Sequence, residues 1–247
     1  KGKRSLSSFS QNTFFTSLPR TNARTPPIMT TIDLQKYQHF SFDMWLTIIR
    51  SHPVFKEQRD RWLRYYFSIT APLDEVHKAI RTVDLQANAE SERTGLHIPQ
   101  QVLFERVLTL LNVPIDEKID WEACFAEQET LFLHYMPQLL DPKIDELFAK
   151  IQSQGKTISL LSNTAFIKGK ALHKVLAYYG LASYFSFELY SDEEGIAKPN
   201  PAIFQKAYEL TNALRPVEKT QWLHIGDNPI ADIQGATNAG LCAFLIS

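Results

Sequence analysis

The second half of the chain alternates short apolar runs with segments of helical periodicity. Apolar runs bounded by turn residues predict strands at 157–161, 185–190, 222–225 and 242–246. The segments between them repeat apolar residues every three or four positions, which predicts helices over 142–153, 168–179, 201–211 and 229–239. Strands and helices in alternation are typical of a parallel sheet with helices on both faces. The sequence therefore predicts an α/β fold.

Three dipeptides predict where helices of this half begin. Asp141-Pro142, Asn200-Pro201 and Asn228-Pro229 each combine a side chain that can cap a helix with a proline suited to the first helical position. The helix expected after Asn228 would point its N-terminus at the edge of the sheet, with Asp232 in its first turns.

A purely helical pattern fills residues 53–136. Its apolar residues recur near helical spacing, in four groups: Phe55, Trp62, Leu63, Tyr66 and Ile69; Val76, Ile80 and Val83; Leu103, Val107 and Leu110; and Trp121, Phe125, Leu131 and Phe132. Breaks fall at Ala71-Pro72, at Gly95 with Pro99, and at Pro114. We interpret this region as an inserted helical cap whose aromatic residues form its own core. The polar stretch 88–95 is expected to be a loop that faces a ligand.

The first 32 residues differ in composition from the rest. They contain five basic residues and no acidic one, with many Ser and Thr, which predicts a disordered arm. Two interpretations stay open: residues 1–28 do not belong to the native protein and Met29 is its true start, or the arm is an organelle-targeting segment. We assign the α/β core to 33–52 and 137–247, and the cap to 53–136.

Composition narrows the functional class. A formal net charge of −1 provides no field that would attract nucleic acid or an acidic membrane, and no apolar run is long enough to cross a bilayer. The basic group Arg59, Arg61 and Arg64 is interpreted as a solvated helix face. The two cysteines, Cys124 and Cys242, are too isolated for a disulfide framework or a zinc site. We expect a soluble, cytoplasmic protein of unpredicted oligomeric state.

Polar side chains follow the apolar strands at three places. Asp43 follows HFSF, Ser162 follows TISLL, and Gly226-Asp227 follows WLHI. Because ligands of open α/β sheets bind at the carboxyl ends of the strands, we expect these side chains to gather at one edge. Each residue alone could be an ordinary turn, cap or surface residue; their order along the chain favours a functional site.

At these residues the chain, from about His39 to Ile246, resembles the haloacid dehalogenase superfamily, which consists mostly of magnesium-dependent phosphatases. The resemblance is carried by SFDMWLT ending at Thr47, LLSNT at 160–164, SDEEGIAKPNPAIF at 191–204 and HIGDNPIADIQGA at 224–236. It implies a Rossmann-like core, a cap that covers the active site, and a hydrolase that acts on a small phosphorylated metabolite as a phosphoric monoester hydrolase.

The resemblance also implies roles for single residues. Asp43 would be the nucleophile and would form an aspartyl phosphate. Mg²⁺ would be held by Asp43, Asp227 and the backbone carbonyl of Trp45. The remaining site residues have expected roles as follows: Ser162, Asn163 and Lys198 bind the phosphoryl oxygens, Thr47 steadies the loop of the nucleophile, and Asp232 either supports the metal site or holds Lys198.

Trp45 departs from the family pattern. Most phosphatases that the chain resembles carry a second Asp here, which protonates the leaving oxygen and then activates water; an indole cannot exchange that proton. His52, chosen only for its proximity in sequence, or a residue of the cap could substitute, or the leaving group could need little protonation. Two alternatives stay open: a metal-free 2-haloacid dehalogenase, against which Asp227 argues, and a catalytically weak protein that binds phosphate or regulates. A phosphonate-cleaving enzyme would need a cap lysine, and neither Lys56 nor Lys78 lies in a recognisable motif.

Overall fold

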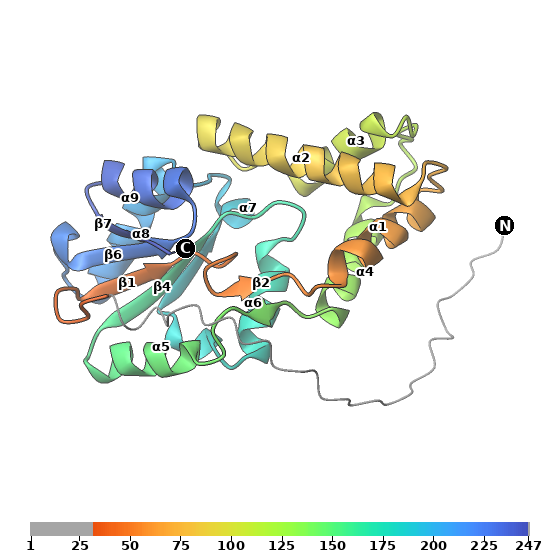
Figure 1. Cartoon of the computed structure of the whole chain (residues 1–247). Coiled ribbons are helices and arrows are strands. Elements are labelled where there is room, and N and C mark those ends of the chain that lie inside the picture. Colours follow the sequence, from red (N-terminus) through yellow and green to blue (C-terminus); the bar gives the residue numbers. More distant parts are fainter. Residues whose placement is uncertain (1–31, 247) are drawn as a thin grey trace, which may run out of the picture.

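The computed structural model describes residues 32–246; the basic arm expected at 1–32 lies outside these residues apart from Ile32. Its centre is a five-stranded parallel sheet of order β5-β4-β1-β6-β7 (Figure 1). The strands are β1 (His39–Phe42), β4 (Thr157–Ser162), β5 (Phe187–Tyr190), β6 (Trp222–Gly226) and β7 (Cys242–Leu245). The predicted α/β fold class is confirmed.

Helices cover both faces of this sheet. The side chains of Leu160 and Leu161 point to opposite faces because side chains alternate along a strand. Leu160 packs in a cluster with α5 (Ile144–Ser153) and α6 (Gly169–Tyr178), and Leu161 packs in a cluster with α8 (Pro201–Leu214) and α9 (Gly235–Asn238). The short helix α7 (Ser191–Glu194) follows β5 directly.

The helix starts match the predicted caps at two of three positions. Asn200 accepts a hydrogen bond from the backbone of Ala202, and Asn228 accepts from Ile230 and Ala231. The third prediction is wrong, because α5 begins only at Ile144 and Asp141 instead closes a turn by accepting from Lys143 N at 2.9 Å. The helix predicted over 229–239 is a π-helical segment, Pro229–Gln234, continued by α9.

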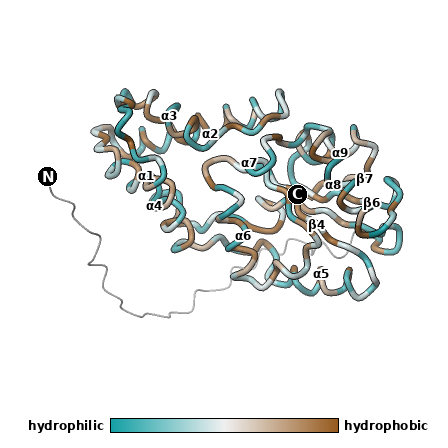
Figure 2. Tube along the Cα trace, turned by 180° about the vertical axis from the view of Figure 1, so that it is seen from behind, coloured by the Kyte–Doolittle hydropathy of each residue, from teal (hydrophilic) through white to brown (hydrophobic). Residues whose placement is uncertain are grey.

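Four helices between the first two core strands form a separate unit, called the cap below: α1 (Phe55–Tyr66), α2 (Leu73–Thr94), α3 (Gln100–Leu110) and α4 (Trp121–His134) (Figure 1). Their apolar faces make a hydrophobic cluster around Phe104, whose ring packs edge-on against Trp62 and Phe166. Hydrophobic and hydrophilic positions alternate along α2 (Figure 2). A two-stranded antiparallel ribbon, β2 (Ile49–Arg50) with β3 (Gln138–Leu139), joins the two connections to the core.

The polar stretch 88–95 is not the loop that the sequence predicted. It continues α2 to Thr94, since it contains good helix formers and no glycine before Gly95, which ends the helix at φ 68°. Gly95 O then accepts from Ala197 N at 3.0 Å and from Asn200 Nδ2 at 3.1 Å, which docks the end of α2 on the core. A Cβ at Gly95 would lie 2.8 Å from Asn200 Cβ, so both conformation and space require glycine.

Within residues 32–246, no helix combines the length and hydrophobicity that spanning a bilayer requires.

A buried histidine makes the stability of the core depend on pH. His39 stacks on Trp222 with ring centroids 5.1 Å apart, and its ring nitrogens lie 2.7 Å from Thr157 Oγ1 and 2.8 Å from Ser159 Oγ. Burial lowers the pKa of His39 to about 3. Its neutral form therefore stabilises the fold above the unfolded pKa of about 6.5, and this contribution is lost as the pH falls from there toward 3.

At pH 5 we expect His39 to reduce the free energy of unfolding by about 2 kcal/mol relative to pH 7.5. Urea denaturation of the wild type and of His39→Gln at both pH values measures the contribution of His39 to the pH dependence of the free energy of unfolding. Glutamine keeps hydrogen-bonding groups but does not titrate. An equal pH dependence in the two proteins would contradict the assignment.

Candidate active site

A cleft of about 370 Å³ lies between the carboxyl edge of the sheet and the cap. The core lines it with Asp43, Trp45, Asn163, Lys198, Asp227 and Asp232. The cap lines it with Phe55, Lys56, Arg59, Arg81, Asn88 and Glu92. Asp43 directly follows β1 and Asp227 directly follows β6, which are neighbours in the sheet, so the topology brings these two carboxylates together.

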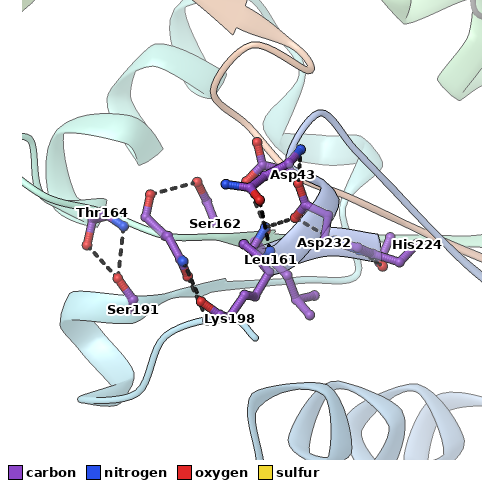
Figure 3. A network of polar contacts seen from close by, with 12 residues as sticks. Asp43, Leu161, Ser162, Thr164, Ser191, Lys198, His224 and Asp232 are labelled. Atoms are coloured by element: carbon purple, nitrogen blue, oxygen red, sulfur yellow. Dashed lines mark hydrogen bonds and ion pairs between the residues drawn. The ribbon is translucent and has the colours of Figure 1, made fainter. Parts of the chain in front are cut away.

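Lys198 is the centre of the polar network (Figure 3). Its ammonium donates to Asp43 Oδ1 at 2.8 Å, to Asp232 Oδ1 at 2.6 Å and to Leu161 O at 2.6 Å. The side chain is only 1% exposed, so its charge is tolerable only because these acceptors compensate it. Burial by itself would lower the pKa of Lys198, but the charges of Asp232 and Asp43 outweigh burial and raise it.

Asp232 is held on both oxygens. Besides Lys198, Oδ1 lies 3.0 Å from His224 Nε2, and Oδ2 accepts from Asn228 N at 3.0 Å. Burial would raise the pKa of Asp232, but the charge of Lys198 and the bond from His224 lower it well below its usual range. Of the two roles expected for Asp232, contact with Lys198 is the one present in this geometry.

His224 is a residue that the sequence interpretation missed. It is fully buried on β6, and its Nδ1 lies 2.6 Å from Ser41 Oγ. A histidine inside an apolar strand, two residues before Gly226, was the available signal. Its side chain ties Asp232 to the sheet.

Asp43 has an oxygen free for chemistry. Oδ1 contacts Lys198, whereas Oδ2 accepts no hydrogen bond from residues 32–246. Burial raises the pKa of Asp43 to about 7; Lys198 lowers it, and Asp232 and Asp227 raise it again. Burial is the largest of these effects, and Lys198 offsets only part of it.

The donor set fits a hard divalent cation. One oxygen each of Asp43, Asp227 and Asp232 lie within 4.8 Å of one another. The carbonyl of Trp45 accepts no backbone hydrogen bond from the described part of the chain, although that of Met44 accepts two. Carboxylate and carbonyl oxygens are the ligands that Mg²⁺ prefers. Asp43, Asp227 and the Trp45 carbonyl are the candidate ligands, with Asp232 beside them.

Of the residues expected to bind phosphate, Asn163 and Lys198 line the cleft and Ser162 does not. Ser162 is fully buried and does not line the cleft, and its Oγ lies 3.4 Å from Asn163 O. Asn163 lines the cleft and clamps the backbone of Lys198 with two 2.8 Å hydrogen bonds. The hydroxyl of Thr47 is buried without a hydrogen-bond partner among residues 32–246, so it makes no bond that would steady the loop.

On the cap side, the interpretation of the basic group is wrong for Arg59. Arg59 is 15% exposed, pairs with the buried Asp60 and lines the cleft, whereas Arg61 is 57% exposed and faces solvent. An aspartate on the apolar face of α1, three residues before Leu63, was the signal for this pair.

His52 is not among the residues that line the cleft. Its Nδ1 accepts a bond from Val54 N, and its ring packs against Tyr135. Trp45 and Phe55 both pack against Phe132 and form an apolar wall instead. His52 is therefore not placed to replace the carboxylate that is missing at position 45.

The chain matches a family model and several known proteins. A family model described as haloacid dehalogenase-like hydrolase matches residues 37–240. The chain is 34% identical over 109 residues to haloacid dehalogenase-like hydrolase domain-containing protein 3 of Homo sapiens, covering 44% of this chain and 40% of that protein. It is 34% identical over 122 residues to phosphoserine phosphatase of Thermus thermophilus, covering 49% and 43%. The chain thus spans about two fifths of the length of these curated relatives.

Solved structures share the fold. The structure of the hydrolase YfnB from Bacillus subtilis, determined bound to magnesium, matches with a TM-score of 0.66 at 20% identity, covering 85% of this chain and 89% of that one. At this identity the likeness is one of fold.

Proposed function

This chain belongs to the haloacid dehalogenase-like hydrolases, and from that premise we propose that it is a magnesium-dependent phosphatase acting on small phosphorylated metabolites through Asp43. The observation that carries the proposal is the buried Lys198, which bridges Asp43 and Asp232 beside Asp227. A second carboxylate beside a nucleophilic one is repulsive without a cation, so Asp227 favours the metal-dependent chemistry.

In the proposed reaction Asp43 Oδ2 attacks the phosphorus in line. The new bond joins this oxygen to phosphorus, and the bond to the leaving oxygen breaks with its electron pair. Water then attacks the phosphorus, the aspartyl bond breaks, and inorganic phosphate leaves. Asp43, Asp227 and the Trp45 carbonyl would hold Mg²⁺, which when bound neutralises phosphoryl oxygens against the anionic nucleophile.

Lys198, Asp232 and Asn163 position the nucleophile and stabilise the transition state. Lys198 binds Oδ1 of Asp43, which leaves Oδ2 for the attack. Its fixed positive charge also stabilises the charge that develops on the phosphoryl group. Asp232 and Asn163 hold the lysine at its ammonium and at its backbone. The relatives support the substrate class, since one of them is a phosphoserine phosphatase.

Phosphate release across a panel of phosphorylated metabolites tests the proposal. We expect Mg²⁺ to support turnover of at least one member and EDTA to abolish it, with restoration when excess Mg²⁺ is added back. Halide release from 2-chloropropionate is measured in parallel. Metal-independent halide release, or folded protein that binds Mg²⁺ and releases neither product, would contradict the phosphatase.

The absence of an acid at Trp45 predicts a strong dependence on the leaving group. General acid help is worth about 10²- to 10⁴-fold, and p-nitrophenolate needs little of it. We therefore expect kcat/KM for p-nitrophenyl phosphate to exceed that for a simple alkyl phosphate by roughly this factor. Equal kcat/KM values would mean that another group protonates the leaving oxygen.

A further inference from the structure

The guanidinium of Arg59 is oriented by a buried carboxylate behind it. Nε and Nη2 both donate to Asp60 Oδ1, at 2.9 Å and 2.7 Å. Asp60 is 2% exposed, and its other oxygen lies 2.7 Å from His77 Nδ1. The side of the guanidinium formed by Nε and Nη2 is therefore occupied, and the planar group has little freedom to rotate.

The end of this guanidinium that carries Nη1 has no hydrogen-bond acceptor among the described residues. Nη1 donates to no residue within 32–246, so the end formed by Nη1 and the outer hydrogen of Nη2 has two parallel donors without acceptors. Arg59 lines the cleft that also contains Asp43 and Lys198. Two parallel N–H donors match the two oxygens of a carboxylate.

Lys56 adds a second positive charge to the same wall. It lies three residues before Arg59 on α1, which places both on one helix face, and it too lines the cleft. Lys56 forms no ion pair with another described residue. We call Lys56 and Arg59 the basic wall.

On the other cap helix of the cleft, the arginine is paired with a carboxylate, and the glutamate is held by a neutral amide. Arg81 Nη1 donates to Asp84 Oδ2 at 2.9 Å, and Glu92 Oε1 accepts from Asn228 Nδ2 at 2.8 Å. In the basic wall, Lys56 therefore offers an unpaired positive charge, and Arg59, although paired with Asp60, offers the free donors at its Nη1 end. The phosphoryl group itself is expected at Asp43 and Lys198, so the wall is left for another part of the substrate.

We propose that the basic wall is a second anion-binding subsite and that the substrate is a small phosphomonoester carrying a carboxylate, which Arg59 binds through its free edge. This rests on the proposed function for the placement of the phosphoryl group.

Binding of non-hydrolysable analogues tests the subsite without turnover. Isothermal titration calorimetry compares phosphonoacetate with 2-hydroxyethylphosphonate, and 3-phosphonopropionate with 3-hydroxypropylphosphonate, at fixed free Mg²⁺. Each pair differs only in carboxylate against alcohol. The proteins are the wild type, Arg59→Gln, Arg59→Lys and the matched control Arg61→Gln, which changes an exposed arginine on the same helix.

We expect the wild type to bind one of the carboxylates roughly 10- to 100-fold more tightly than its alcohol, as two charge-assisted hydrogen bonds would give. Arg59→Gln removes this preference, Arg59→Lys keeps a small part of it, and Arg61→Gln keeps all of it. Equal affinity within both pairs in the wild type, no binding of either carboxylate, or a preference that survives Arg59→Gln would overturn the subsite.

Failure of the phosphatase would be seen separately. It would leave this binding preference intact while no phosphate ester is turned over.

Discussion

Replacement of Asp43 by Asn is expected to abolish phosphate release, lowering kcat by roughly 10⁴- to 10⁶-fold, the scale seen when a nucleophile is removed. The amide keeps the size of the side chain but cannot attack phosphorus as an anion. Because burial and two neighbouring carboxylates raise the pKa of Asp43 to about 7, its ionised form is unfavourable in the metal-free fold.

Because of the raised pKa of Asp43, a stability measurement can distinguish loss of the nucleophile from loss of the fold in Asp43→Asn. A group whose folded pKa is raised stabilises below its unfolded pKa, near 4, and that contribution is lost as the pH rises through about 7. At pH 8 without Mg²⁺, Asp43→Asn should therefore unfold at the same or a higher urea concentration than the wild type. If Asp43→Asn is inactive but also destabilised, the loss of activity does not identify Asp43 as the nucleophile. Substantial remaining turnover would exclude Asp43 as the nucleophile.

Replacement of Lys198 by Met is the second change with a large expected effect. Methionine fills similar volume but leaves Asp43 and Asp232 buried without their cation. We expect kcat to fall roughly 10²- to 10³-fold, as when one charge-stabilising donor is lost. We also expect a destabilisation of about 3–5 kcal/mol at pH 8, the cost of breaking a buried ion pair.

This destabilisation should shrink as the pH falls, because the unpaired carboxylates can then be protonated. Urea denaturation at pH 8 and pH 6, together with phosphate release, measures both effects. Lys206→Met is the control: this lysine is 47% exposed and pairs with Glu194 on the surface. Equal stability of the two variants would show that Lys198 does not hold the carboxylates together.

Local pattern predicted the parts of the fold that local physics determines. The alternation of apolar runs with helical segments gave the α/β core, and Asn200 and Asn228 cap their helices because the cap bond joins residues only two or three apart. The same pattern placed Asp43 and Asp227 after their strands, at one sheet edge. Their catalytic roles remain proposals.

Some errors arose where distant segments meet, and others from local signals with two meanings. Whether Arg59 faces solvent or the cleft depends on how the cap sits over the core, which no short pattern encodes. The bond from Asn228 to Glu92 joins residues separated by 136 positions, so nothing local predicts it. Residues 88–95 are polar but helical, because polarity alone does not distinguish a loop from the exposed face of a helix, and only Gly95 ends α2.

Mass spectrometry of protein quenched with acid during turnover of p-nitrophenyl phosphate tests whether Asp43 is the nucleophile. Since the leaving group needs no acid and no carboxylate at Trp45 activates water, phosphorylation should be faster than hydrolysis and the intermediate should accumulate. We expect a phosphoryl group on the peptide containing Asp43, present with Mg²⁺ and absent from Asp43→Asn. Turnover with no such adduct, or an adduct on another residue, would contradict it.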